Sequence, residues 1–183
     1  VDILNSKSVR EVVGKADTVL HLAASPLLAS LERPILNMKI NIEGTLNILE
    51  ASKEFGIDKV IFSSASSVVG DVKYNPIDEE HPCSPKTPYA VAKKACEDYL
   101  KVYKSIFNLD YLIFRFFNVY GPWQYPESGA LIPKIYSYLS KGKTFEIYGD
   151  GSATRDYIYV EVVADFCYEV AQKNIKNEIV NIG

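Results

Sequence analysis

Short apolar runs alternate with helix-length segments over the first two thirds of the chain. The runs cover residues 17–24, 59–64 and 111–117, and each is long enough for a strand buried on both faces. Between them, residues 37–55 and 88–107 have the length and apolar spacing of helices. Strand, helix, strand, helix and strand in this order predict βαβ units with right-handed crossovers. We therefore expect an α/β fold with a doubly wound parallel sheet.

Smaller elements follow the third run. The pattern predicts a loop rich in proline and glycine over 120–129, helices over 131–140 and 162–172, a short strand over 145–148, and a last strand ending at Gly183.

In a parallel sheet, ligands bind beyond the carboxyl ends of the strands. Small or polar residues follow each apolar run: Ala23-Ala24-Ser25 after the first, the serines of residues 63–67 after the second, and Asn118 after the third. Ordinary turn composition would explain them equally well. Position alone therefore marks a candidate edge of the sheet and no particular chemistry.

Composition excludes several classes of protein. Lys and Arg number 20 against 23 for Asp and Glu, so the formal charge is −3 and gives no basic field for nucleic acid. The most apolar run is far shorter than the roughly 20 residues that cross a bilayer, so no membrane partner is expected. Cys83, Cys96 and Cys167 lack metal-ligand spacing and suit a reducing compartment. A cytoplasmic protein that needs no metal is the resulting expectation.

Tyr89 and Lys93 are spaced i and i+4, which places both side chains on one face of the helix predicted over 88–107. An ammonium group favours a phenolate and lowers the pKa of a tyrosine, so the pair could act as a base near neutral pH. One exposed pair supplies too little stabilisation, and a bound cationic ring or a shielded pocket would have to contribute. A solvated helix face is the alternative interpretation, and the spacing alone is weak evidence.

The pair belongs to a longer ordered set of motifs, which resembles the extended short-chain dehydrogenase/reductase family and, more narrowly, its nucleotide-sugar epimerases and dehydratases. The motifs are Asp2-Ile3, His21-Leu22-Ala23-Ala24, Ser30 with Pro34, Asn41 with Gly44-Thr45, the serine run ending in Gly70, Pro88-Tyr89-Ala90 with Lys93, Arg115 with Asn118-Val119-Tyr120-Gly121-Pro122, Gly149-Asp150-Gly151, and Arg155-Asp156-Tyr157.

The resemblance implies NAD as the cofactor, a Rossmann-type sheet, and a role for each matching residue. Tyr89 would be the catalytic base, Lys93 would hold the nicotinamide ribose, and Ser64 would bind the same sugar oxygen as Tyr89. The cofactor would contact Asp2, Ile3, Leu22, Ala23, Ala24, Asn41, Ser63, Tyr89, Lys93 and Phe117. The nucleotide sugar would contact Ser64, Asn118, Leu131, Tyr148 and Arg155.

Some family features are missing from the sequence. The glycine-rich turn that cradles the cofactor pyrophosphate does not occur, so we expect the 183 residues to be the central part of a longer enzyme, without its first strands. Residues 1–117 and 156–172 would then form mainly the coenzyme-binding core, and 118–155 and 173–183 part of a small substrate-binding lobe. As an isolated fragment, the chain is expected to be inactive.

The serine run leaves the catalytic hydroxyl open. Ala65 stands where the family spacing from Gly70 places a hydroxyl residue, so Ser64 is the first choice and Ser66 the second. Val69 and Val162 also replace residues common in the family, a tyrosine and an aspartate, and Glu161 could substitute for the latter as a helix cap.

The same run favours one reaction. The family's dehydratases carry an acidic residue directly after the catalytic hydroxyl, whereas this chain has Ala65, Ser66 and Ser67. Without a local carboxylate we expect epimerisation through a transient 4-keto sugar, with UDP-glucose and UDP-galactose as the substrate pair. A dehydratase or reductase of the same family is the alternative, and a non-catalytic dinucleotide-binding fragment is a second. The resemblance also suggests a homodimer through residues 37–55 and 88–107. The residues themselves do not distinguish NAD from NADP, because the residue that reads the ribose would follow the second strand of the family's sheet, before Val1.

Overall fold

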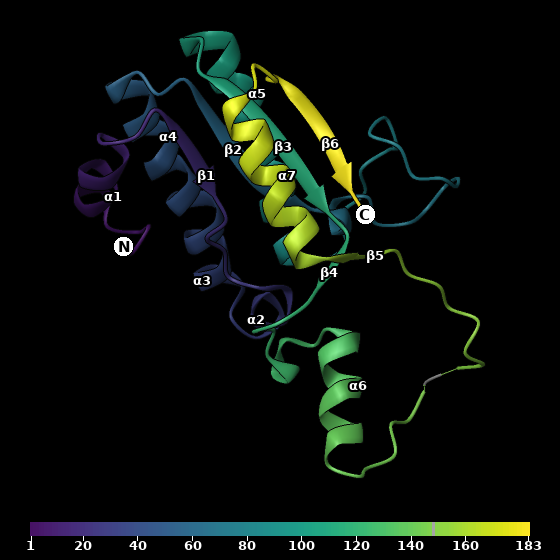
Figure 1. Cartoon of the computed structure of the whole chain (residues 1–183). Helices are drawn as coiled ribbons and strands as arrows, with labels where there is room; N and C mark the ends of the chain where they lie inside the picture. Colours follow the sequence, from purple (N-terminus) through teal and green to yellow (C-terminus); the bar gives the residue numbers. More distant parts are fainter. Residues whose placement is uncertain (148) are drawn as a thin grey trace.

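A parallel sheet of four strands forms the centre of the structure (Figure 1), a computed structural model in which residues 1–147 and 149–183 are described. The strands lie in the order β1-β2-β3-β6, with bounds Thr18–His21 for β1, Lys59–Ala65 for β2, Asp110–Phe116 for β3 and Glu178–Ile182 for β6. All neighbours pair in parallel. The three apolar runs are therefore confirmed as adjacent strands.

Helices cover both faces of the sheet, which confirms the doubly wound prediction. Three lie on one face and one on the other: α1 (Ser6–Val13), α4 (Gly44–Phe55) and α5 (Pro88–Phe107), opposed by α7 (Val160–Gln172). Because successive strand residues point to opposite faces, Val60 and Phe62 pack against α4 and α5, whereas Ile61 packs against α7. Complete burial of each such side chain contributes about 1.5–3 kcal/mol.

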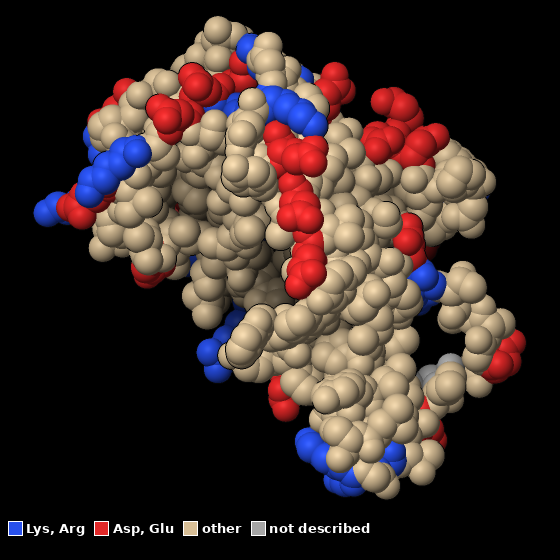
Figure 2. Space-filling view, in the orientation of Figure 1, with Lys and Arg blue, Asp and Glu red and all other residues tan. Residues whose placement is uncertain are grey.

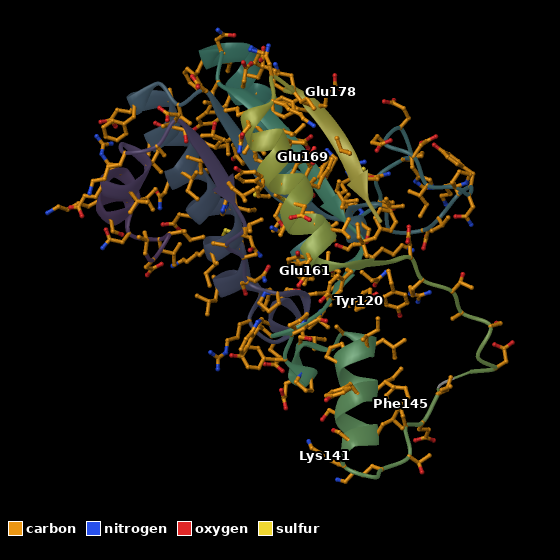
Figure 3. All side chains as sticks on the ribbon, in the orientation of Figure 1. Tyr120, Lys141, Phe145, Glu161, Glu169 and Glu178 are labelled. Carbon is orange, nitrogen blue, oxygen red and sulfur yellow. The ribbon has the colours of Figure 1, made fainter. Side chains whose placement is uncertain are left out.

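The α7 face is open over β1. Leu20 is 42% exposed, although its register partner Ile61 is completely buried. Figure 2 shows the surface hollowed between β1 and α7, beside a line of acidic side chains. Glu161 and Glu169 project outward from α7 in the same region (Figure 3). The hollow adjoins the carboxyl end of β1, which is the edge where ligands bind in such sheets.

One continuous helical segment changes pitch along its length. After α2 (Leu27–Glu32), it comprises α3 (Pro34–Met38), a π-helical turn η1 (Lys39–Glu43), and α4. The helix predicted over 37–55 is thus confirmed but begins earlier, at a proline in its first turn. It ends at Gly56 in a left-handed conformation with φ 66°.

A smaller lobe lies beyond the carboxyl ends of the strands (Figure 1). It includes β4 (Asn118–Tyr120) and β5 (Tyr157–Tyr159), which pair in parallel, with η3 (Pro126–Ser128) and α6 (Leu131–Ser140). The predicted helix over 131–140 is confirmed. The predicted strand over 145–148 is wrong for residues 145–147, which are irregular because no strand pairs with them, and Tyr148 lies outside the described residues. Among the described helices, none is long and apolar enough to cross a membrane.

Candidate active site

Helix α5 presents Tyr89 and Lys93 toward the carboxyl end of β2. Thr87 caps its first turn by accepting a hydrogen bond from the Ala90 amide at 3.2 Å, and Pro88 occupies the first helical position. Lys93 is only 2% exposed, and its Nζ donates to the Ser63 carbonyl at 2.6 Å. The predicted pairing of this tyrosine and this lysine on one helical face is therefore present in the structure.

Burial controls the acid–base properties of both groups. The Lys93 Nζ lies 5.8 Å from the centre of the Tyr89 ring and 4.7 Å from that of Phe62. Burial lowers the pKa of Lys93 to about 8 and raises the pKa of the Tyr89 phenol above its ordinary value. Lys93 alone therefore does not make Tyr89 a base at neutral pH, and further positive charge is needed beside the phenol.

Lys93 has hydrogen-bond donors that no described residue uses. An ammonium group has three N–H donors, and Lys93 uses one on the Ser63 carbonyl. In the described part of the chain no carboxylate forms an ion pair with it. A buried cation with free donors suits a ligand that carries hydroxyl groups, such as a ribose.

The serine run divides between the interior and the cavity. Ser64 is 2% exposed, and its Oγ donates to Glu97 Oε1 at 2.6 Å. Ser66 begins the short helix η2 (Ser66–Val68) and lines a cavity of about 1000 Å³. Ser67 has a buried hydroxyl that finds no hydrogen-bond partner within residues 1–147 and 149–183. The structure therefore brings Ser66, and not Ser64, to the cavity wall.

Two cavities meet at Phe117 and Asn118. The larger also contains Ser66 and Arg155, and the smaller, of about 370 Å³, contains Tyr89 and Leu131. Tyr120 lies between the sheet and α6 (Figure 3) and packs against Tyr157 and Tyr159. The predicted substrate residues Asn118, Leu131 and Arg155 thus line the cavities, whereas Tyr148 lies outside the described residues.

Asn41, predicted to lie beneath the cofactor, fixes the turn that follows β1. Its Oδ1 accepts from the Ser25 amide at 2.9 Å, and its Nδ2 donates to the Ser25 carbonyl at 3.0 Å. The Asn41 carbonyl, within the π-helical turn, accepts from Thr45 Oγ1 at 2.6 Å and from Cys96 Sγ at 3.2 Å. The turn next to it exposes Leu22, Ala23 and Ala24, which the sequence assigned to the cofactor.

Asp2 and Ile3 lie beside the beginning of α4. The Ile3 carbonyl accepts from Asn47 Nδ2 at 2.9 Å, and a Cβ on Gly44 would meet the Ile3 side chain at 2.5 Å. A larger residue at position 44 would therefore require the Ile3 side chain to shift. Asp2 remains exposed at the chain surface, where its carboxylate accepts from the Leu4 amide.

Two buried polar groups near this site received no role from the sequence, although His21 belongs to one of the motifs. His21 Nε2 lies 2.9 Å from Thr45 Oγ1, and because that hydroxyl donates to Asn41, the ring nitrogen is the donor. Burial, aided by the charge of Lys93, lowers the pKa of His21 to about 3, so the ring is neutral. The second group is Glu97, which pairs with Arg115 in the interior. Its spacing of four from Lys93 was the available signal.

The sheet and the tyrosine–lysine helix define the chain as part of a Rossmann-type, dinucleotide-dependent enzyme. All of it, residues 1–183, matches the NAD dependent epimerase/dehydratase family, and the chain belongs to that family. NAD is the family's cofactor. One solved relative, a UDP-glucose 4-epimerase from Thermus thermophilus in complex with NAD, is 33% identical to this chain with a TM-score of 0.89. The alignment covers 100% of this chain and 62% of that relative.

Other relatives have related activities. A putative UDP-glucose 4-epimerase of Methanocaldococcus jannaschii is 41% identical over 91% of this chain and 55% of its own length. The UDP-N-acetylglucosamine 4-epimerase of Methanobrevibacter ruminantium, solved with UDP-N-acetylmuramic acid, is 35% identical with a TM-score of 0.94 over 100% of this chain and 59% of its own. A dTDP-D-glucose 4,6-dehydratase of Mus musculus is 35% identical over 100% and 52%, respectively. The chain therefore spans little more than half the length of these relatives.

Proposed function

We propose that the protein carrying this chain is an NAD-dependent 4-epimerase that interconverts UDP-glucose and UDP-galactose. The observation that carries the proposal is the position of Tyr89, which lines a cavity together with Asn118 and Leu131 while the buried Lys93 lies one helical turn away. The relatives named for 4-epimerisation of UDP-sugars support the same class of reaction.

Each side chain has a distinct task in this proposal. Tyr89 takes a proton from the sugar hydroxyl, and Lys93 holds a ribose hydroxyl with its free N–H donors while its charge favours the phenolate. Bound NAD supplies a hydride acceptor and donor, which is the chemistry that reversible oxidation of a sugar carbon requires. The Leu22-Ala23-Ala24 turn and Phe117 lie where the dinucleotide would pass along the edge of the sheet.

We assign the catalytic hydroxyl to Ser66, because Ser66 lines the larger cavity and Ser64 donates its proton to a buried carboxylate. Arg155 lines the same cavity, and its guanidinium fork suits the oxygens of a nucleotide diphosphate. Residues 1–117 and 156–172 would serve mainly the coenzyme, and 118–155 and 173–183 mainly the sugar nucleotide.

Epimerisation is preferred to dehydration because no carboxylate directly follows the serine. Elimination of water needs an acid and a base on the oxidised sugar, and neither Ser67, which follows Ser66, nor Ala65, which follows Ser64, carries a carboxylate. Epimerisation needs only the transient 4-keto sugar and return of the hydride to its other face.

The assembly and location are also proposals. Val91, Val102 and Ile106 are exposed apolar residues of α5, and together with α4 they would form a homodimer interface, which light scattering on the gene product would test. Cys83, Cys96 and Cys167 are free, which suits a reducing compartment, so we place the protein in the cytoplasm.

The deciding experiment is an assay of the gene product that contains these residues, with UDP-galactose and NAD, followed by UDP-N-acetylglucosamine, UDP-glucuronate and dTDP-glucose. Formation of UDP-glucose is the expected result. Tyr89→Phe should lower kcat by about 10²- to 10⁴-fold with NAD binding intact, while Tyr99→Phe, an exposed tyrosine on the same helix, should leave it unchanged. Elimination of water from any substrate would replace this proposal with a dehydratase, and NAD binding without turnover would favour the non-catalytic alternative.

A further inference from the structure

A buried ion pair joins the helix that carries Tyr89 to the sheet. Glu97 lies on α5 one turn beyond Lys93 and is 0% exposed, and Arg115 lies on β3 and is 3% exposed. Arg115 Nε donates to Glu97 Oε1 at 3.0 Å and Nη2 donates to Oε2 at 2.8 Å. Such a two-pronged, charge-assisted pairing fixes the relative orientation of both side chains.

Ser64 is the third member of this unit. Its Oγ donates to Glu97 Oε1 at 2.6 Å, and Ser64 also lies opposite Arg115 in the register between β2 and β3. The carboxylate is therefore bonded from the strand end that carries the serine run and from the neighbouring strand. The distance between the end of β2 and α5 is set by these bonds.

Arg115 also reaches the loop between η2 and α5. Its Nη1 donates to the Glu79 carbonyl at 3.2 Å, and its Nη2 lies 3.4 Å from Cys83 Sγ. Earlier residues of this loop, Asn75, Pro76 and Ile77, line the larger cavity.

The middle of the loop, at Ile77 and Glu79, is hydrogen-bonded to β6. The Glu79 carboxylate accepts from the Asn181 amide at 2.7 Å, and Asn181 Nδ2 donates to the Ile77 carbonyl at 3.1 Å. Arg115 thus connects α5, through the Glu97 carboxylate, with the loop that forms one wall of the cavity, through the Glu79 backbone carbonyl.

Stability does not explain such a pair. Desolvation of two buried charges offsets most of their mutual attraction, and well-packed apolar residues often serve equally well. Glu97, Arg115 and Ser64 are buried, do not line either cavity, and form side-chain hydrogen bonds with one another. The remaining consequence of the pair is geometric.

We propose that Glu97 and Arg115, with Ser64, form a positioning unit that sets the Ser66 hydroxyl against the Tyr89 phenol and holds the 71–87 loop over the sugar. This inference rests on the proposed function. Small displacements of reacting groups reduce rates strongly, so loosening the unit should lower turnover in a protein that remains folded.

The test compares three substitutions in the gene product with a matched control. Ser64→Ala removes one neutral donor, Glu97→Gln removes the charge with little change in shape, and Arg115→Lys keeps the charge but loses the fork. Asp98→Asn breaks the exposed Lys94–Asp98 pair on the same helix and is the control. Folding is followed by circular dichroism, NAD and UDP-galactose binding by calorimetry, and turnover by kcat and KM.

We expect Ser64→Ala and Glu97→Gln each to lower kcat about tenfold and to raise KM, with stoichiometric NAD binding. Because the two act through one carboxylate, the double variant should lose no more than the worse single one, whereas adding Ser66→Ala should multiply the loss. Asp98→Asn should match the wild type. Rates within twofold of the wild type, or losses that only follow the folded fraction, would overturn the inference.

A catalytic Ser64 gives a different pattern. Ser64→Ala would then lower kcat far more than Glu97→Gln does, and Ser66→Ala would have little effect on kcat. This result would also overturn the inference. Should Glu97→Gln fail to fold, Ser64→Ala and the comparison with Ser66→Ala still decide. A wild type that binds UDP-galactose without converting it would overturn the proposed reaction alone, and the positioning role would then depend on whether Glu97→Gln or Ser64→Ala weakens that binding.

Discussion

Asn118 donates two hydrogen bonds to one oxygen, the carbonyl of Asp156. Its backbone amide lies 3.2 Å from that oxygen and its Nδ2 lies 2.7 Å away. The two bonds join the first residue of β4 to the segment before β5, where the two cavities meet. The side chain of Asn118 therefore supports the cavity wall, in addition to any direct contact with substrate.

Loss of the hydrogen bond from the Asn118 side chain should affect substrate affinity more than folding. Asn118→Ala is expected to raise KM for the nucleotide sugar up to about tenfold and to cost about 1 kcal/mol of unfolding free energy, since one hydrogen bond is lost. Asn47→Ala, which removes a similar bond to the Ile3 carbonyl, should cost a comparable amount without changing that KM. Steady-state kinetics and urea unfolding measure both quantities, and equal KM values in the two variants would refute the role.

Gly70 is required by its surroundings. Its φ is 69°, and a Cβ there would lie 1.8 Å from the Ser84 carbonyl oxygen. Gly70→Ala should therefore lower the free energy of unfolding by at least about 2 kcal/mol, from backbone strain and the clash combined. Gly142→Ala is the matched control, because Gly142 has φ 64° with nothing within 4 Å, and about 1 kcal/mol is expected. Equal losses in urea denaturation would show that the clash relaxes.

Much of this fold follows from periodicity. The centres of the runs that form β2 and β3 are apolar at successive positions because helices cover both faces of these strands, whereas β1 is covered on one face only. Helices α5 and α6 begin and end where proline and the apolar spacing indicate. By contrast, β4 and β5 have three residues each and exist only because they pair with each other across a long separation. Helix α1 has eight residues and packs against α4 through Val9 and Val13.

The site was predictable only where chemistry and spacing coincide. Tyr89 and Lys93 follow from the i, i+4 rule, but Glu97 would be read by the same rule as a surface partner of Lys93. Its actual partner, Arg115, lies on strand β3. One signal for Ser64 was present: alternation along β2 places it on the same side as Phe62, which packs against α5.

His21 makes the stability of the fold depend on pH. Its pKa is about 3 in the folded protein against an ordinary value of 6.5, because burial, aided by the charge of Lys93, disfavours the cation. The unfolded chain therefore binds more protons between these values, so the contribution of His21 is complete above pH 6.5 and is lost as the pH falls toward 3. Between pH 7 and 5 we expect a loss of about 2 kcal/mol.

His21→Gln provides the control for this effect. Glutamine can still donate an N–H toward Thr45 but does not titrate, so its free energy of unfolding should change less over the same interval. Urea titrations at pH 7 and pH 5 measure the difference. Parallel losses in the two proteins would mean that other groups cause the pH dependence.

Arg155 should act mainly on substrate binding. It is exposed, lines the larger cavity, and donates to the Thr154 carbonyl at 2.7 Å, so most of its N–H groups have no partner among the described residues. Arg155→Ala is expected to raise KM for the nucleotide sugar about 10- to 100-fold, with a smaller effect at high salt. Arg33 is an exposed arginine that lines neither cavity, so the control Arg33→Ala should leave KM unchanged. An unchanged KM in Arg155→Ala would show that the diphosphate of the ligand binds elsewhere.

The number of residues in the π-helical turn over Lys39–Glu43 determines how the helical faces on its two sides are oriented. Such a turn holds one residue more than an α-helical turn, so the faces before and after it differ in phase by about 100°. Asn37 and Asn41 can therefore face the Ser25 turn while Ile48 and Leu49 face the core. Deleting a single residue here would rotate the asparagines away from the turn even though every apolar residue of α4 stayed in place. The extra residue in this turn therefore sets how Asn37 and Asn41 are rotated relative to the apolar face of α4.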